Sequence, residues 1–325
     1  MSEQNSSSDD GVDLPHELIC MGRIGVDLYP LQDRVPLAEV TSFGKYLGGS
    51  PSNVAVAAAR HGHRTAIITR TGRDAFGEYL RSELSRLGVD ARWAVALDDA
   101  RTTLAFCEIF PPDHFPLTFY RDQTPPELRI APAEIDIARV AAAEVLWVTA
   151  TAFSAEPSRE AHHGALAAHA GRTTILDLDH RPGYWADEAS AAAELDRVWG
   201  TVRIAVGNLE ECRVAVGESD PDRAADALLA RGVETAIIKL GPLGVLGATR
   251  DERVLVPPTP VEVVNGLGAG DAFGGALVHG VLAGWTLERL LRFSSAAGAI
   301  VAGRRECSTA MPTTDEVDRL LTKGS

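Results

Sequence analysis

The sequence has few cysteines, no long apolar run and no concentration of positive charge. Its four cysteines, Cys20, Cys107, Cys212 and Cys307, lie far apart and form no CxxC pair, which argues against a disulfide framework or a zinc knuckle. No apolar run approaches the roughly 20 residues that cross a bilayer, and the first residues lack the basic-then-apolar layout of a signal peptide. We therefore expect a cytoplasmic protein without a membrane partner.

Acidic residues outnumber basic residues in the chain. Its 325 residues include 31 Lys and Arg against 45 Asp and Glu, which gives a net charge of −14 and a pI of about 5.1. Proteins that bind nucleic acid usually carry a basic face or stripe, and the sequence contains no Lys/Arg-rich run of that kind. We expect no nucleic-acid partner, and an anionic substrate needs a local cationic pocket within a repulsive overall field.

Apolar segments of strand length alternate with helical patterns over most of the chain. Helices are predicted over 51–61 and 74–87. The predicted strands are Leu18–Val26, Thr65–Thr69, Val145–Thr149, Thr173–Leu178, Val202–Val206 and Thr235–Lys239. Such alternation predicts an α/β fold with a mostly parallel central sheet flanked by helices on both faces.

The domain organisation follows from where this alternation starts and breaks. Residues 1–15 are rich in Ser and Asp and are expected to form a flexible tail, whereas residues 16–325 form one domain. The segments at about 27–46 and 92–121 contain proline and short alternating runs. They predict a small β-sheet lid over the main sheet, an ordinary edge hairpin being the alternative. Exposed lid edges favour a homodimer formed through the lid strands.

A glycine-rich turn is the clearest chemical motif. Residues 261–284 read as a short strand, a turn and a long helix of small residues. The backbone N–H groups of Gly268, Ala269 and Gly270 converge at the predicted helix N-terminus and form an anion site. Asp271 is a poor phosphate ligand there, but it suits a base that accepts a proton from an attacking hydroxyl. Taken alone, the turn fits a helix-capping role for Asp271 equally well.

A second glycine turn, more than two hundred residues earlier, also leads into a helix of small residues. It contains Gly49 and, on the first helical turn, Asn53. A buried amide side chain is costly without partners, and it offers a polyol both a donor and an acceptor. A bond from Asn53 to its own backbone is the alternative.

Together, in this order and spacing, the two turns resemble the ribokinase/PfkB family of carbohydrate kinases from about Leu18 to Leu321. The resemblance implies a ribokinase-like fold, ATP as phosphoryl donor and Mg²⁺. It implies that sugar hydroxyls are bound by Asp27, Gly49 and Asn53, and that Asp271 is the catalytic base beside the Gly268–Gly270 anion hole. It further implies a nucleotide and metal site that comprises Asn208, Glu211, Lys239, Gly241 and Gly244, in which Glu211 helps to organise Mg²⁺.

One position departs from the family pattern. The second motif usually opens with Asp-Thr, whereas here it opens with Asn265-Gly266. The resemblance allows a monovalent cation such as K⁺. The lost carboxylate and hydroxyl argue against a cation site formed by this opening. They leave the predicted anion hole and base unchanged.

Two short stretches bear on the substrate. Residues 119–121 and 177–182 are similar to elements of sugar-acid kinases in which two arginines bind the substrate carboxylate, here Arg121 and Arg181; surface ion pairs are the alternative. Longer runs over 22–30, 41–49, 106–112 and 206–211 are similar to family members that phosphorylate the terminal hydroxyl of 5-dehydro-2-deoxy-D-gluconate in inositol catabolism. Three alternatives stay open: 2-keto-3-deoxygluconate, a neutral sugar such as fructose or ribose, and a non-catalytic sugar- or nucleotide-binding sensor.

Overall fold

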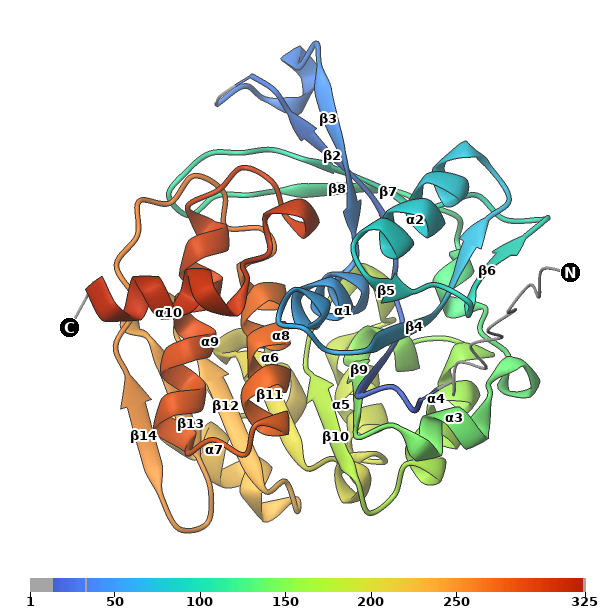
Figure 1. Ribbon diagram of the computed structural model, residues 1–325. Helices are drawn as coiled ribbons and strands as arrows, with labels where there is room; N and C mark the ends of the chain where they lie inside the picture. The colour runs from blue at the N-terminus through green and yellow to red at the C-terminus, as the bar shows by residue number, and fades with distance from the viewer. Residues whose placement is uncertain (1–13, 33, 324–325) are drawn as a thin grey trace, which may run out of the picture.

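A ten-stranded sheet forms the centre of the protein (Figure 1). The computed structural model describes residues 14–32 and 34–323, so the expected tail lies almost wholly outside the described residues. The strand order is β14-β13-β12-β11-β10-β9-β1-β4-β5, with β6 paired to β4. The strands are β1 (Leu18–Met21), β4 (Thr65–Gly72), β5 (Val89–Asp90), β6 (Ala94–Leu97), β9 (Val145–Thr149), β10 (Thr173–Asp177), β11 (Ile204–Asn208), β12 (Thr235–Lys239), β13 (Val245–Ala248) and β14 (Arg253–Val256).

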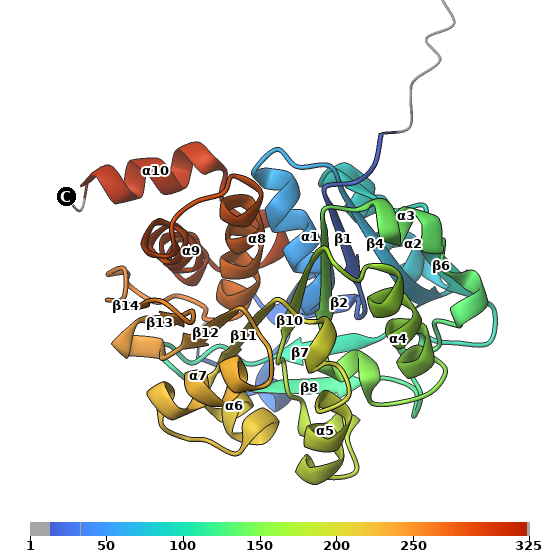
Figure 2. The ribbon, with the colours of Figure 1, turned by 90° about the horizontal axis from the view of Figure 1, so that it is seen from below.

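Pairing is parallel from β6 and β5 through to β12, whereas β13 pairs antiparallel with both β12 and β14. Helices cover both faces, as Figure 2 shows for α1, α8 and α9 on one side and α5, α6 and α7 on the other. The first face carries α1 (Ser50–Arg60), α2 (Ala75–Arg86), α8 (Ala269–Leu282) and α9 (Leu287–Ala302), with α10 (Thr314–Lys323) packed on α9. The second carries α3 (Ile137–Ala142), α4 (Ser158–Ala168), α5 (Glu188–Leu195), α6 (Leu209–Val216) and α7 (Pro221–Ala230). The predicted α/β class is confirmed.

The central strands supply both hydrophobic cores. In β1, Leu18 and Cys20 belong to the core under α1 and α8, whereas Ile19 and Met21 belong to the core under α3–α7. All four side chains are fully buried, as expected where successive residues point to opposite faces of a sheet covered on both sides. Within residues 14–32 and 34–323, no helix is long and apolar enough to cross a bilayer.

A second, four-stranded sheet lies across one end of the main strands (Figure 1). Its order is β3-β2-β7-β8, with β2 and β7 parallel and the other pairs antiparallel. Its strands are β2 (Gly25–Pro30), β3 (Phe43–Gly48), β7 (Leu104–Cys107) and β8 (Leu117–Tyr120). We call it the small sheet. From the segment expected to contribute to a lid at about 92–121, residues 94–97 instead form β6 of the main sheet.

Two sequence-based predictions about strands are wrong. The segment 18–26 is not one strand: β1 ends at Met21, Gly22 takes a φ of 139°, and β2 begins at Gly25 in the small sheet. The positive φ turns the chain from one sheet to the other. Residues 261–264 form no strand, because the N–H groups of Val264 and Asn265 both donate to the carbonyl of Ala302 at the end of α9.

Helices α1 and α8 approach each other unusually closely. A Cβ added to Gly275 would lie 2.3 Å from the Ala57 Cβ and 2.7 Å from the Ala58 backbone nitrogen. A Cβ on Gly274 would lie 2.7 Å from the Trp147 ring. No real Cβ tolerates such distances, so only glycine lets α8 pack this tightly on α1.

We predict that Gly275→Ala lowers the free energy of unfolding by about 1–3 kcal/mol, because the methyl group overpacks the helix contact. Gly164 is the matched control: it lies inside α4 with nothing within 4 Å of an added Cβ. Gly164→Ala should raise stability by about 0.5–1 kcal/mol through the lower entropy of the unfolded chain. Urea unfolding of both variants measures the difference, and equal effects would contradict the packing argument.

Candidate active site

A cavity of about 320 Å³ lies between the main sheet and the small sheet. Asp177, Asn208 and Lys239, each the last residue of its strand, line it from the main sheet. Asp27 and Phe119 line it from the small sheet. The carboxyl edge of a parallel sheet is the usual place for ligands in open α/β folds.

Most of the sequence-predicted site residues meet in this cavity, although they come from distant parts of the chain. Those that line it are Asp27, Gly49, Asn53, Arg181, Asn208, Glu211, Lys239, Gly268, Gly270 and Asp271. The predicted residues that are not among its lining are Arg121, Gly241, Gly244 and Ala269. The cavity therefore gathers the expected sugar, phosphate and base positions into one space.

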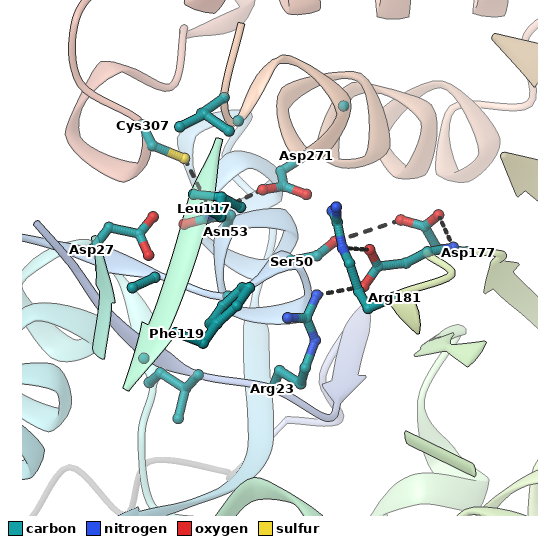
Figure 3. Close-up of a pocket in the computed structure, with 18 of the residues that line it drawn as sticks. Arg23, Asp27, Ser50, Asn53, Leu117, Phe119, Asp177, Arg181, Asp271 and Cys307 are labelled. Atoms are coloured by element: carbon teal, nitrogen blue, oxygen red, sulfur yellow. Dashed lines mark hydrogen bonds and ion pairs between the residues drawn. The ribbon is translucent and has the colours of Figure 1, made fainter. Parts of the chain in front are cut away.

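Asn53 and Asp271 form a hydrogen bond in the cavity (Figure 3). The Asn53 Nδ2 donates to the Asp271 Oδ2 at 2.8 Å and lies 3.1 Å from the Cys307 Sγ. The Asn53 Oδ1 is buried and has no hydrogen-bond partner among the described residues, so it is available to a ligand hydroxyl. Asp271 does not cap α8: the N-cap is Gly268, and no side chain makes a capping hydrogen bond.

Burial raises the pKa of several carboxyl groups in the cavity, among them Asp271 and Asp27. Desolvation raises the pKa of Asp271 to about 6, against the opposing hydrogen bonds from Asn53 and Ser50 and with a further rise from the charge of Asp177. Desolvation likewise raises the pKa of Asp27 to about 7, although the Tyr29 hydroxyl donates to its carboxylate at 3.2 Å. The pKa of Asp271 is therefore closer to neutral pH than that of an exposed aspartate.

The N-terminus of α8 lies beside Asp271 and has the features of an anion-binding site. Gly268 has a φ of 82°, and a Cβ there would lie 2.3 Å from the Cys307 Sγ, so the turn requires glycine. The first N–H groups of a helix have no intrahelical acceptor and carry partial positive charge. Lys239 places a full positive charge near this helix N-terminus. Its Nζ would lie 3.5 Å from a Cβ placed on Gly270.

Glu211 and Lys239 lie next to this anion site. Asn208 and Glu211 form a reciprocal capping box at the start of α6: the Glu211 N–H donates to the Asn208 Oδ1 at 2.9 Å, and the Asn208 N–H to the Glu211 Oε2 at 2.7 Å. Burial opposes the charge of Lys239, but Asp177 and Glu211 outweigh it and raise its pKa. Lys239 therefore stays protonated despite its burial.

Arg121 occupies a position outside the cavity lining. Its Nη2 donates to the Gly183 carbonyl at 2.6 Å, and its guanidinium lies 3.9 Å from the centre of the Tyr184 ring. Tyr184 itself lines the cavity. Arg121 thus touches the site through Tyr184, whereas Arg181 reaches the cavity directly and donates from its Nε to Asp179 at 2.8 Å.

Sequence reasoning missed several polar residues that line the cavity, among them Arg23, Asp177 and Cys307. Asp177 carries a usable signal, because it ends a buried strand next to the strand that ends at Asn208. Cys307 carries none, since its contact with Gly268 joins segments whose proximity only the fold reveals. Arg23 lies in the segment mistaken for a continuous strand, which concealed its exit from the sheet.

The fold and sequence both match known proteins. The chain resembles a putative ribokinase II from E. coli in complex with ATP and Mg²⁺ (TM-score 0.86, 23% identity, 95% of this chain and 99% of that one). It also resembles a fructokinase double mutant from Vibrio cholerae with fructose, ADP and potassium ion bound (TM-score 0.83, 23% identity, 95% and 100%). These likenesses confirm the ribokinase-like fold.

Two sequence relatives are more similar to this chain in sequence than these two solved structures are. A 5-dehydro-2-deoxygluconokinase of Photobacterium profundum is 34% identical over 311 residues, covering 93% of each chain. A protein of the same name from Shouchella clausii is 32% identical over 313 residues, covering 94% of this chain and 95% of that one. The family model for pfkB family carbohydrate kinases matches residues 15–314. On this match, which contains both glycine turns and every residue that lines the cavity, the chain belongs to the pfkB family of carbohydrate kinases.

Proposed function

We propose that the protein transfers the γ-phosphoryl group of ATP to the terminal hydroxyl of a sugar acid, and that this acid is 5-dehydro-2-deoxy-D-gluconate. The observation that carries the proposal is the Asn53–Asp271 pair, which lies beside the anion site of α8 in a cavity that also contains Arg181. The names of the relatives from Photobacterium profundum and Shouchella clausii support the choice of acid.

In the proposed reaction, Asp271 accepts the proton of the terminal hydroxyl as the oxygen attacks the γ-phosphorus. The hydrogen bond from Asn53 holds the carboxylate in place and stabilises its charged form. The backbone of Gly268–Gly270 and the Lys239 ammonium stabilise the charge of the transferring group. Asp27 and the free Oδ1 of Asn53 bind other hydroxyls of the sugar.

The nucleotide is proposed to lie along the turn after β12. Gly241 and Gly244 have φ angles of 57° and 100°, and a Cβ on Gly244 would lie 2.0 Å from the Val256 carbonyl oxygen, so this turn brings the backbone very close to β14. Mg²⁺ prefers oxygen ligands and retains several waters, and the Glu211 carboxylate beside Asp177 fits that preference. Bound with ATP, the ion supplies neutralisation of phosphate charge.

A monovalent cation is not needed in this proposal. Asn265 is fully buried, and both ends of its amide are used within the protein. Its Nδ2 donates to the Arg305 carbonyl at 2.8 Å, and its Oδ1 accepts from the Leu267 N–H at 3.1 Å. These two hydrogen bonds of Asn265 fix the loop before α8. At this position the chain has an amide side chain, whereas the family usually has a carboxylate.

We also propose a cytoplasmic homodimer that forms through the small sheet. β3 and β8 are its edge strands, and Tyr120 at the end of β8 is 62% exposed. Open edges of this kind pair readily with another chain. Light scattering on the purified protein should give twice the mass of 34.6 kDa, and a monomer at micromolar concentration would contradict this part of the proposal.

The reaction itself is tested by a coupled ADP assay on a panel of sugar acids and neutral sugars. We predict that the wild type consumes ATP with 5-dehydro-2-deoxy-D-gluconate, and that Asp271→Asn loses roughly 10²–10⁴-fold in kcat, the usual contribution of a general base. Equal activity of the two proteins would rule out Asp271 as the base. Preference for 2-keto-3-deoxygluconate or fructose would contradict the proposed substrate but keep the kinase activity. Sugar binding in calorimetry, without turnover of ATP, would indicate a sensor.

The pKa of Asp271 predicts the pH dependence. The base acts only when ionised, so kcat/KM should fall about tenfold per pH unit below about pH 6. Asn53→Ala removes a hydrogen bond that favours the carboxylate, so the pKa should rise and the acid limb should move to higher pH. Asp27→Asn is the control, because it removes another carboxyl group whose pKa is raised yet should leave the acid limb near pH 6. A limb that follows Asp27 would contradict the assignment.

A further inference from the structure

Arg23 is a buried arginine that lines the cavity and has no role in the function described so far. It lies between β1 and β2 and is only 6% exposed. Its Nη2 donates to the Asp179 Oδ2 at 2.5 Å, and its Nε has no hydrogen-bond partner among the described residues. Burying a guanidinium donor without a partner costs free energy, so the Nε can donate to a ligand that enters the cavity.

The surroundings of Arg23 keep it charged. Desolvation opposes its charge, but the nearby Asp179 and Tyr184 outweigh desolvation and raise its pKa above the usual value. The Tyr184 ring centre lies 5.4 Å from the guanidinium. A second carboxyl, Glu127, is buried close by and accepts hydrogen bonds from Thr103 and Tyr184. Arg23 is therefore a permanent cation held at the wall of the cavity.

Asp179 is shared between two guanidinium groups. Its Oδ2 accepts from Arg23, while its Oδ1 accepts from the Arg181 Nε at 2.8 Å. One carboxylate thus orients two arginines toward the same region of the cavity, and both arginines line it. Such a pair of forks is well suited to a further carboxylate, because guanidinium binds planar carboxylates through two parallel hydrogen bonds.

An unpartnered Nε alone does not make a ligand site. Arg70 in β4 is also buried, is ion-paired with Glu134 at 2.9 Å, and has an Nε without a partner. Arg70 does not line the cavity. The position of Arg23 in the cavity is therefore the distinguishing observation, and Arg70 is a matched structural control.

The placement fits a substrate with acidic and hydroxyl ends. Figure 3 shows the Arg23 guanidinium pointing into the space between Phe119 and Arg181, with Asp271 entering from the opposite side. A sugar whose terminal hydroxyl meets Asp271 consequently extends its other end toward Arg23. In a sugar acid, that other end is the carboxylate.

We propose that Arg23, together with Arg181, binds the carboxylate of the substrate and determines the selection of sugar acids over neutral sugars. This inference rests on the proposed kinase function and gives a specificity role to a residue for which the sequence analysis had none. A neutral sugar leaves the buried guanidinium unpaired, and sites built to bond one group reject analogues that lack it. Asp179 acts as a positioning residue, since it holds both arginines.

The test compares two substrates that differ in one group: 5-dehydro-2-deoxy-D-gluconate and its primary amide, which has the same hydroxyls but no charge. For Arg23→Met, we expect KM for the acid to rise by at least about tenfold, while kcat/KM for the amide stays within about twofold. The ratio of kcat/KM for acid to amide should therefore collapse. Arg70→Met should retain the wild-type ratio of kcat/KM for acid to amide, even if its melting temperature falls as far as that of Arg23→Met.

Three outcomes separate the role of Arg23 from the proposed kinase function. An equal loss of kcat/KM for acid and amide in Arg23→Met would overturn the inference, because a structural role affects both substrates alike. If Arg23→Met does not fold, Arg23→Lys retains the charge without the fork, and an unchanged KM for the acid would then overturn it. Wild-type protein that phosphorylates neither substrate would instead contradict the proposed function, whatever the variants do.

Discussion

The close contact between α1 and α8 is the constraint on which the site depends. Gly275 lets the backbone of α8 approach Ala57 and Ala58, where any side chain would collide. That approach sets Asn53, on the first turn of α1, within 2.8 Å of Asp271 on the first turn of α8. The two glycine turns that begin these helices are more than 200 residues apart in sequence, and the packing of small residues brings them to one cavity.

The second constraint is electrostatic. The chain is acidic overall, and the cavity is lined by many carboxylates, among them Asp27, Asp177 and Asp271. Burial raises the pKa of each of these three. Cations are placed at separate positions: Lys239 beside the anion site, and Arg23 with Arg181 on the shared Asp179. The cavity thus contains two separate positively charged regions in an otherwise acidic environment.

The sequence predicted the parts of the fold that local patterns determine. The strand at Thr235–Lys239 has the predicted bounds, and α1 differs from its prediction by one residue at each end. Long-range features were not predictable in the same way. The break after Met21 depends on Gly22 and on a second sheet that only the assembled fold provides. The motifs likewise contained Asn53 and Asp271, whereas the places of Arg23 and Cys307 in the cavity depend on how distant segments fold together.

The central claim is that the Asn53–Asp271 pair directs phosphoryl transfer to the terminal hydroxyl of a sugar acid. The most direct measurement is NMR of the product formed from ATP and ¹³C-labelled 5-dehydro-2-deoxy-D-gluconate by the wild-type protein. The account predicts phosphorus coupling at the terminal carbon and one ADP for each phosphorylated acid. ADP release without a phosphorylated acid, or coupling at another carbon, would contradict it.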